Sequence, residues 1–207
     1  MNRIATVTRV TKETDITVAV NLDGTGVAEI ETGVPFFDHM LDAFARHGLI
    51  DLEVRAQGDI EVDAHHTVED TGIVLGQALA EALADKRGIT RFGSQLVPMD
   101  EALVLAAVDI SGRGQLHWAV DLPFGCVGTF DTQLAKEFFI ALAANAGVTL
   151  HVRELAGENA HHIIEASFKA CGRALRAAVE HDPRIGDALP STKGSLCSPS
   201  SITTRGT

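Results

Sequence analysis

Two copies of one histidine-rich motif, about half a chain apart, constrain this sequence more than any other feature. Residues 64–70 read AHHTVED and residues 160–166 read AHHIIEA. The separation of 161 − 65 = 96 residues in a chain of 207 indicates a duplicated unit. In such chains each copy forms one supersecondary unit that buries its apolar face against the other.

The similarity between the two halves extends beyond the motif. Three further pairs of segments match in the same order: VNLDGTG (20–26) with VDISGRG (108–114), HMLDAFARHG (39–48) with EFFIALAANAG (137–147), and LIDLEVRA (49–56) with VTLHVREL (148–155). The offsets differ slightly, so we expect small insertions, the largest around Pro123 to Gly128. Four matched segments in one order are hard to explain as chance likeness between short amphipathic stretches.

Hydrophobic periodicity predicts strand, strand, short strand, helix, strand, helix in each half. In the first half we expect strands near 3–10, 15–22, 27–31 and 49–56, and helices near 36–47 and 64–86. In the second half we expect strands near 93–97, 101–110, 115–121 and 148–155, and helices near 131–145 and 160–180. The apolar residues of the helix that follows the first motif predict one buried stripe; they are Val68, Ile73, Leu75, Leu79 and Leu83.

The predicted fold class is α+β, a tandem duplication of a half-domain with a mainly antiparallel or mixed sheet and two helices on one face. The first repeat should span residues 1–90 and the second residues 91–190. Residues 191–207 are rich in Ser and Thr, which predicts a partly disordered tail.

Composition excludes several classes of protein. A formal net charge of −11 argues against non-specific nucleic-acid binding, which needs a positive surface. No apolar run reaches the ~18 residues needed to span a bilayer, and the first twenty residues lack a signal-peptide core. The three cysteines, Cys126, Cys171 and Cys197, are odd in number and far apart. This pattern favours a reducing cytoplasm over a disulfide framework, so we expect a cytoplasmic protein with no nucleic-acid or membrane partner.

Each motif offers ligands for a metal ion, since neutral imidazole and carboxylate both bind transition metals. The first supplies His65, His66 and Glu69, and the second supplies His161, His162 and Glu165. On a helix, a first histidine and a glutamate four residues later share one face, whereas the adjacent histidine points about 100° away. Adjacent rings would therefore reach different ions, and the chain should bind two metals, each drawing on both halves.

Two more positions match across the repeat at the start of the preceding helix, His39 and Glu137 (137 − 39 = 98). Pseudo-two-fold logic then predicts one set of His39, His66, His161 and Glu165, and another of His65, Glu69, Glu137 and His162. Mixed nitrogen and oxygen ligation suits Mn or Fe, with Zn also possible. The structural alternatives are a solvated His–Glu helix surface and, for His39, a partly buried residue at a helix N-terminus.

Arginine presents a fork of donors that suits phosphate oxygens. Arg91 lies between the halves and Arg113 lies in the turn SGRG, although either one could be ordinary surface charge. Ser191, Thr192 and Lys193 begin the tail and could close over an anion with two hydroxyls and an ammonium.

Glu13 and Glu101 also match across the repeat (101 − 13 = 88). A carboxylate beside a metal pocket can act as general acid or base, and the alternative is a solvated glutamate at a strand start. We interpret His47, His117, His151 and His181 as structural by default.

Five segments together resemble the imidazoleglycerol-phosphate dehydratase family, over about residues 3–194: FFDHMLDAFARHG, GDIEVDAHHTVEDTGIVLG, PMDEALVLAAVDISGRG, GENAHHIIEASFKA and LPSTKG. The resemblance is to the monofunctional form, since no segment remains for a fused phosphatase. It implies dehydration of imidazole glycerol phosphate to imidazole acetol phosphate in histidine biosynthesis, with two Mn²⁺ per active site. It also implies self-association to a 24-mer built from trimers, with active sites between subunits.

The resemblance also implies roles for individual residues. The positions that match metal ligands are His39, His65, His66, Glu69, His161, His162 and Glu165, with Glu137 where some relatives carry histidine. The positions that match substrate contacts are Glu13, Arg91, Arg113, Ser191, Thr192 and Lys193, and His47 and Lys169 fall in substrate-proximal segments. Of the metal ligands, five are also expected to lie against the substrate: His39, His65, His66, Glu69 and His161. Glu13 and Glu165 are the expected catalytic residues.

These roles suggest a mechanism with a physical basis. The hydrogen to be removed is not acidic, so the ring must first become electron-rich. Two cations on the ring nitrogens would favour loss of the ring proton and give a bound imidazolate that expels hydroxide. Glu13 would then remove the neighbouring C–H proton, while Arg91, Arg113 and Lys193 hold the phosphate.

Two alternatives follow from the same residues. A dinuclear metal hydrolase acting on phosphate esters would use a bridging hydroxide and release free phosphate. A metal-storage or assembly protein would bind the ions without turnover, although ferritin-like sites use Glu-x-x-His in helical bundles, the reverse order.

Overall fold

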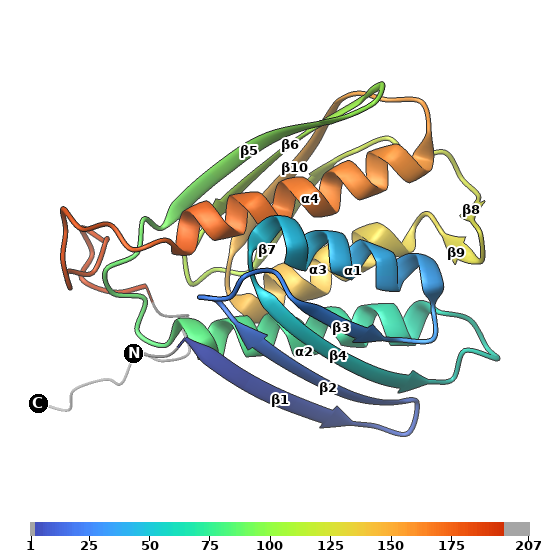
Figure 1. Ribbon diagram of the computed structural model, residues 1–207, viewed down its shortest axis with the longest axis horizontal. Helices are drawn as coiled ribbons and strands as arrows, with labels where there is room; N and C mark the ends of the chain where they lie inside the picture. Colours follow the sequence, from blue (N-terminus) through green and yellow to red (C-terminus); the bar gives the residue numbers. More distant parts are fainter. Residues whose placement is uncertain (1–2, 197–207) are drawn as a thin grey trace, which may run out of the picture.

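The computed structural model describes residues 3–196, and in it two β-sheets enclose a layer of four helices (Figure 1). The first half contains β1 (Ile4–Val10), β2 (Thr14–Asn21), β3 (Ala28–Glu31), α1 (Pro35–Gly48), β4 (Asp51–Gly58) and α2 (His65–Leu83). The second half contains β5 (Phe92–Met99), β6 (Ala102–Asp109), β7 (Gln115–Ala119), α3 (Leu134–Ala146), β10 (Thr149–Ala156) and α4 (Ala160–Val179). These bounds agree with the sequence-based elements to within a few residues.

The two halves share one topology. The strand order is β1-β2-β4-β3 in the first sheet and β5-β6-β10-β7 in the second. In each sheet one edge pair is parallel, β3 with β4 and β7 with β10, and the other pairs are antiparallel. The duplicated α+β half-domain predicted from the sequence is confirmed. The β4–β10 match is shifted by one residue from the sequence alignment, since Leu52 and Leu150 are the equivalent buried residues (150 − 52 = 98).

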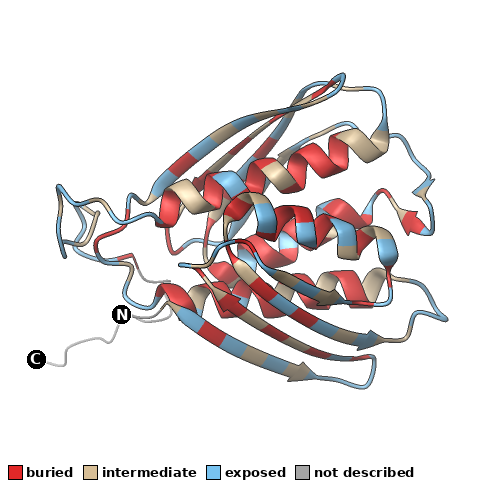
Figure 2. Ribbon diagram, viewed as in Figure 1, coloured by how far each residue is buried: buried red, intermediate tan, exposed pale blue. Residues whose placement is uncertain are grey.

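Strict alternation of side chains builds each sheet's inner face. On β2, Ile16, Val18 and Val20 are buried, while the residues between them face outward. The buried residues of both halves form one continuous core between the sheets (Figure 2). The repeats are therefore two copies of a topology around a shared core.

The buried surface of α2 is wider than the single apolar stripe predicted from the sequence. Ile73 is only partly buried, whereas Gly72, Val74 and Gly76 are buried. The helix packs against β1 and β2 on one side and against α3 on another, so most of its circumference is covered. A Cβ on Gly76 would come within 2.8 Å of the Leu142 carbonyl oxygen, so this contact requires glycine.

The helices are arranged so that all four begin at the same end of the molecule (Figure 1). α1 packs against α4 at a close crossing, where a Cβ on Gly172 would lie 2.4 Å from the Phe44 carbonyl oxygen. Because His39 lies near the start of α1 and His161 near the start of α4, this crossing aligns residues far apart in the sequence.

The predicted insertion forms a short hairpin of β8 (Cys126–Val127) and β9 (Phe130–Asp131) at that same end. Phe130 anchors the hairpin by packing against Phe36 and Phe37. Within residues 3–196, no helix is long and apolar enough to cross a membrane. Of the predicted tail, residues 191–196 are described and include a turn closed by a hydrogen bond from the Gly194 N–H to the Ser191 carbonyl. Cys197 and the rest of the tail, 198–207, lie outside the described residues.

Candidate metal and substrate site

One group of predicted ligands meets where α1 and α4 begin. His39 Nε2 lies 3.3 Å from Glu165 Oε2, and His161 Nε2 lies 3.0 Å from the same oxygen. One ligand atom from each of these three residues lies within 4.8 Å of the others. Atoms that bind one ion at about 2.0–2.4 Å can be no more than about 4.8 Å apart. The three residues therefore fit a divalent cation with mixed nitrogen and oxygen ligands.

Glu165 is the most buried of the three residues, with only 6% of its surface exposed. Burial alone would raise the pKa of Glu165, but a hydrogen bond and the positive charge of Lys169 lower it, with smaller effects from His161 and His39. The Lys169 Nζ atom lies 2.7 Å from Glu165 Oε1. An ionised carboxylate is the form that binds a cation, so Lys169 supports the ligand role of Glu165.

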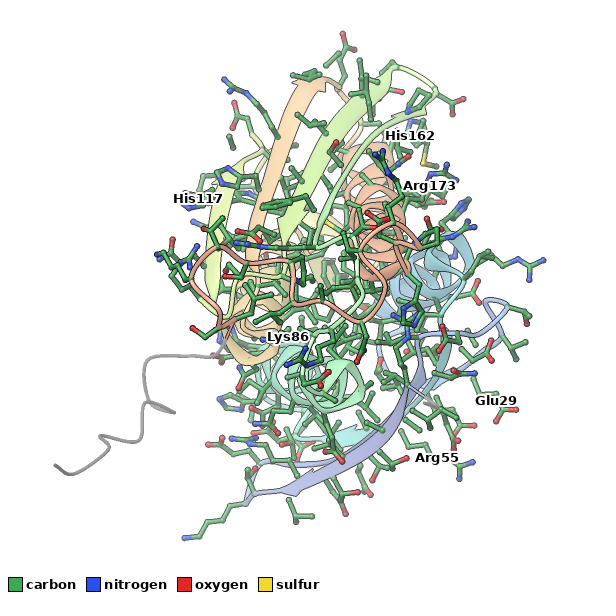
Figure 3. The ribbon with its side chains drawn as sticks, turned by 90° about the vertical axis from the view of Figure 1, so that its left-hand side faces the viewer. Glu29, Arg55, Lys86, His117, His162 and Arg173 are labelled. Carbon is green, nitrogen blue, oxygen red and sulfur yellow. The ribbon has the colours of Figure 1, made fainter. Side chains whose placement is uncertain are left out.

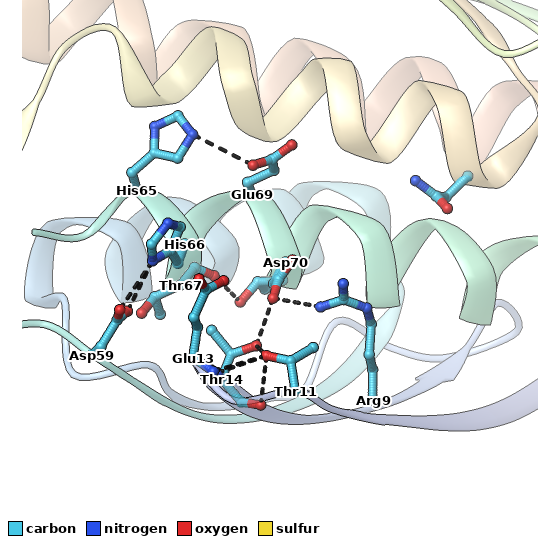
Figure 4. Close-up of polar contacts among 12 residues, drawn as sticks. Arg9, Thr11, Glu13, Thr14, Asp59, His65, His66, Thr67, Glu69 and Asp70 are labelled. Carbon is cyan, nitrogen blue, oxygen red and sulfur yellow. Dashed lines mark hydrogen bonds and ion pairs between the residues drawn. The ribbon is translucent and has the colours of Figure 1, made fainter.

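A second group lies where α2 and α3 begin. His65 Nε2 is 3.4 Å from Glu69 Oε2, the i,i+4 contact predicted from the helix (Figure 4). His65 and Glu137 line one cavity of about 690 Å³, together with Asp63 and Asp131. The cavity is open to solvent and rich in carboxylates, and so could hold a cation beside a polar ligand.

The second histidine of each motif turns away from both groups. His66 Nδ1 lies 3.0 Å from Asp59 Oδ2, and His162 Nδ1 lies 2.7 Å from Glu101 Oε2. The hydrogen bond that His66 donates to Asp59 raises the pKa of His66, and the one that His162 donates to Glu101 raises the pKa of His162. The same contact, helped by the Asn159 N–H, lowers the pKa of Glu101 to about 2. A single copy of the chain does not bring either ring to the four-ligand set predicted for it, and those sets stay predictions.

The predicted catalytic residue Glu13 lies in the exposed turn between β1 and β2. The Thr11 hydroxyl accepts hydrogen bonds from the Glu13 and Thr14 N–H groups and fixes the turn, and the Glu13 carbonyl accepts one from the Asp59 N–H. This hydrogen bond joins the β1–β2 turn to the loop between β4 and α2, and it places Glu13 and Asp59 close to the start of α2, beside His66 (Figure 4).

A buried carboxylate that the sequence analysis missed ties this turn to the helix. Asp70 is 7% exposed and accepts hydrogen bonds from the Arg9 guanidinium and the Thr14 hydroxyl (Figure 4). It directly follows Glu69, and its counterpart in the second motif is Ala166. The two motifs differ at this position, and this difference could have identified Asp70 from the sequence. A charged residue that only one of two similar copies carries is not required by the packing that both copies share.

The residues predicted to bind phosphate gather at the opposite end of the helices. Arg91 donates to Asp109, at 2.8 Å, and to the Pro190 carbonyl, also at 2.8 Å. Arg113 lies 3.8 Å from Asp109, and Ser191, Thr192 and Lys193 follow Pro190 directly.

This cluster is far from the metal ligands of the same chain. The Arg91 N–H donates to the carbonyl of Ala178, near the end of α4, whereas His161 is at the start of that helix. The 178 − 161 = 17 residues between them span about 26 Å at 1.5 Å per residue. One chain therefore does not bring the predicted phosphate and metal groups together.

His47 and Lys169, the less specific substrate predictions, lie near each other in the α1–α4 contact. Burial lowers the pKa of His47, and the charges of Lys169 and Arg173 lower it further. Because Lys169 is paired with Glu165, its charge is partly compensated, and the substrate roles of His47 and Lys169 stay predictions.

Comparison with known proteins was made on the sequence and on the fold. Residues 32–175 match the family model described as imidazoleglycerol-phosphate dehydratase. The chain is 65% identical over 194 residues to the imidazoleglycerol-phosphate dehydratase of Dinoroseobacter shibae, covering 94% of this chain and 100% of that protein. It is 61% identical to that of Gluconacetobacter diazotrophicus, covering 94% of this chain and 98% of that protein.

Two solved structures have a similar fold. The crystal structure of imidazoleglycerol-phosphate dehydratase from Staphylococcus aureus has a TM-score of 0.79 and 42% identity, covering 86% of this chain and 99% of that one. The enzyme from Pyrococcus furiosus in complex with (S)-C348 has a TM-score of 0.79 and 43% identity, covering 92% of this chain and 100% of that one. The chain belongs to the imidazoleglycerol-phosphate dehydratase family of hydro-lyases.

Proposed function

We propose that this protein dehydrates D-erythro-imidazole glycerol phosphate to imidazole acetol phosphate in histidine biosynthesis. The observation that carries the proposal is the convergence of His39, His161 and Glu165 on one cation-sized volume, in a chain whose relatives bear the name of this activity. The substrate's imidazole ring would bind beside the ligands, and its phosphate would bind to arginine and lysine.

We propose two Mn²⁺ ions as cofactors. His39, His161 and Glu165 would contribute to holding one ion, and His65, Glu69 and Glu137 would contribute to the other, since their donor atoms match its preference for nitrogen and oxygen. When bound, the cations supply positive charge that makes a ring N–H proton easier to remove.

A complete site would need more than one copy of the chain. The phosphate-binding candidates lie about 26 Å along α4 from His161, and His66 and His162 turn away from the ligand groups. A neighbouring copy would supply the missing groups, so the active sites would lie between subunits; the assembly we propose is a 24-mer built from trimers.

Residues of this chain would bind the phosphate, accept the proton and hold the ligand set. Arg91, Arg113 and Lys193, with Ser191 and Thr192, would bind the phosphate and fix the reacting carbons. Glu13 would accept the C–H proton, because it stands on a fixed turn and keeps a carboxylate exposed beside His66. Glu165, kept ionised by Lys169, would hold the ligand set in its binding form.

The test is Glu13→Gln, compared with the parent protein and with Glu158→Gln, an exposed glutamate outside both ligand groups. We expect Glu13→Gln to retain bound manganese and substrate binding but to lose at least about 100-fold in kcat, the usual contribution of general acid–base catalysis. Near-normal turnover would reject the role of Glu13. Release of free phosphate from the substrate in place of a new ketone would reject the dehydratase in favour of a phosphoester hydrolase.

A further inference from the structure

Each repeat places a carboxylate against the second histidine of its motif, but the two carboxylates come from different parts of the fold. In the first repeat, His66 Nδ1 lies 3.1 and 3.0 Å from the two carboxylate oxygens of Asp59 (Figure 4). In the second repeat, His162 Nδ1 lies 2.7 Å from Glu101 Oε2. His162 is on α4 next to β5 and β6 (Figure 3), and Glu101 lies in the turn between these two strands.

The two acidic residues are not equivalent in the duplicated fold. The counterpart of Glu101 is Glu13, since each directly precedes the second strand of its sheet (101 − 13 = 88). Asp59 directly follows β4, so its counterpart is Gly157, which directly follows β10 (157 − 59 = 98). A Cβ on Gly157 would lie 2.5 Å from Cγ1 of the buried Ile163. The second repeat therefore has no room for an acidic side chain at the place of Asp59.

Both carboxylate oxygens of Glu101 are bonded within the chain. While Oε2 contacts His162, Oε1 accepts hydrogen bonds from the N–H groups of Asn159, at 2.9 Å, and Glu158, at 3.3 Å. These two N–H groups directly precede α4. Glu101 therefore joins the β5–β6 turn to the start of α4 and to the histidine on that helix.

The Glu13 side chain differs from its counterpart in this respect. Its turn is fixed through the backbone, by the bonds to Thr11 and from the Asp59 N–H. Among residues 3–196, the Glu13 carboxylate accepts no hydrogen bond and forms no ion pair, and the Asp59 carboxylate bonds only to His66. In the first repeat Asp59 therefore takes the place that Glu101 has in the second, and the Glu13 carboxylate is left unbonded.

A carboxylate at Nδ1 determines which ring nitrogen is left for a metal ion. An ionised carboxylate only accepts hydrogen bonds, so Nδ1 must carry the proton and Nε2 keeps its lone pair. Histidines that bind metals commonly donate their other N–H to a carboxylate, which fixes the tautomer and the orientation of the ring. Within residues 3–196, Nε2 of neither His66 nor His162 has a hydrogen-bond partner; Asp100 Oδ2 lies 3.7 Å from the latter, beyond bonding distance.

We propose that Asp59 and Glu101 are positioning residues: each orients one histidine and leaves its Nε2 atom to bind a cation. Because Asp59 serves His66 in this way, Glu13 stays free for proton transfer. This role rests on the proposed function, in which a neighbouring copy brings the other ligands and the substrate. Two glutamates in equivalent turns thus have different tasks, since Glu101 holds a ligand and Glu13 faces the substrate.

Amide substitutions test the two positions, because an amide has one acceptor oxygen and one donor NH₂ group. In Glu101→Gln the oxygen can stay with the two N–H groups before α4, which turns the NH₂ group toward His162. This favours a proton on Nε2, where it blocks the cation. In Asp59→Asn the amide oxygen can still face His66, because the Asp59 carboxylate has no second partner in the described chain.

The measurement is manganese bound per chain at graded free Mn²⁺, by equilibrium dialysis and elemental analysis. Glu101→Gln and Asp59→Ala should each weaken the binding of one of the two proposed ions by about 10–100-fold, whereas Asp59→Asn should bind manganese as the parent does. Glu158→Gln and Glu61→Ala, at exposed residues of the same two loops, should leave manganese binding unchanged. Both amide variants keep the size of the parent side chain, so they can be compared even if Asp59→Ala does not fold. Parent-like binding in Glu101→Gln or Asp59→Ala, or equal weakening in the two Asp59 variants, would overturn the proposal.

Turnover at saturating manganese then separates the two glutamates. Glu101→Gln should approach the parent kcat once manganese is in excess, since this residue acts only through His162. Glu13→Gln should bind manganese normally and keep a low kcat at every manganese concentration. An equally low kcat in both variants at saturating manganese would refute the division of tasks. Absence of turnover in the parent protein would instead reject the proposed function, and the manganese comparison would still test the positioning role.

Discussion

Asp70 should stabilise the turn that carries Glu13 through its bonds with Arg9 and Thr14. Asp70→Asn keeps the shape and one acceptor oxygen but removes the charge opposite the Arg9 guanidinium. Breaking a fully buried pair costs about 3–5 kcal/mol, and a hydrogen bond to a charged group contributes about 1.5–3 kcal/mol. Here the Asp70 side chain is 10% exposed and that of Arg9 is 34% exposed, so water partly compensates the arginine. We expect a loss of about 2 kcal/mol in the free energy of unfolding.

The assay is a double-mutant cycle with Asp70→Asn, Arg9→Met and both together, by thermal or urea unfolding at one protein concentration. The fixed concentration matters because association also stabilises the chain. The coupling energy should be about 1.5–2 kcal/mol, since removing the second partner adds little once the first is gone. Arg176→Met and Glu180→Gln form the matched control, an exposed i,i+4 pair at 3.3 Å that should couple by no more than about 0.5 kcal/mol. Additive losses at Arg9 and Asp70, within about 0.5 kcal/mol, would refute the reasoning.

The turn gives this network a functional consequence. Because Thr14 and Glu13 are adjacent, loss of the Asp70 anchor should move the Glu13 carboxylate relative to α2. Turnover of Asp70→Asn should therefore fall at temperatures where the protein is still folded, with manganese content unchanged. A kcat equal to that of the parent would show that the anchor acts on stability alone.

Three further predictions concern packing, pH and metal. Helix propensity alone predicts that Gly76→Ala stabilises α2 by about 1 kcal/mol. The new Cβ would lie 2.8 Å from the Leu142 carbonyl oxygen, and overpacking costs about 1–3 kcal/mol. The melting temperature should therefore fall, and a rise would contradict the α2–α3 contact. Hydrogen bonds from the N–H groups of Thr25 and Val27 are the main causes that lower the pKa of Asp51. The stability that ionised Asp51 contributes is present above the pKa of an unfolded aspartate, near 4, and is lost as pH falls below it. Asp51→Asn should therefore be less stable than the parent at pH 7 and should lose less stability on acidification; parallel curves of stability against pH would argue against this. Glu165→Gln should bind less manganese per chain by elemental analysis than Glu158→Gln, and equal manganese in the two variants would remove Glu165 from the ligand set.

Local geometry explains what the sequence determined. The repeat, the order of the elements and the two i,i+4 contacts, His65 with Glu69 and His161 with Glu165, follow from periodicities of 2 and 3.6 residues, which need no knowledge of distant segments. The choice of residues for metal chemistry also followed from residue type and spacing, and it stays a prediction; the structure brings His39, His161 and Glu165 together.

Only the tertiary structure decided which residues meet across long distances. His39 reaches Glu165, 126 residues away, because α1 and α4 cross closely at Gly172. Arg91 lies at the far end of α4 because the link between the repeats enters there. Packing between helices and sheets sets these positions, and a linear pattern carries no register between elements that are not neighbours in the chain. Residue type and periodicity therefore predicted the fold class and the candidate ligands, whereas packing placed the candidate metal and phosphate groups of one chain at opposite ends of a helix.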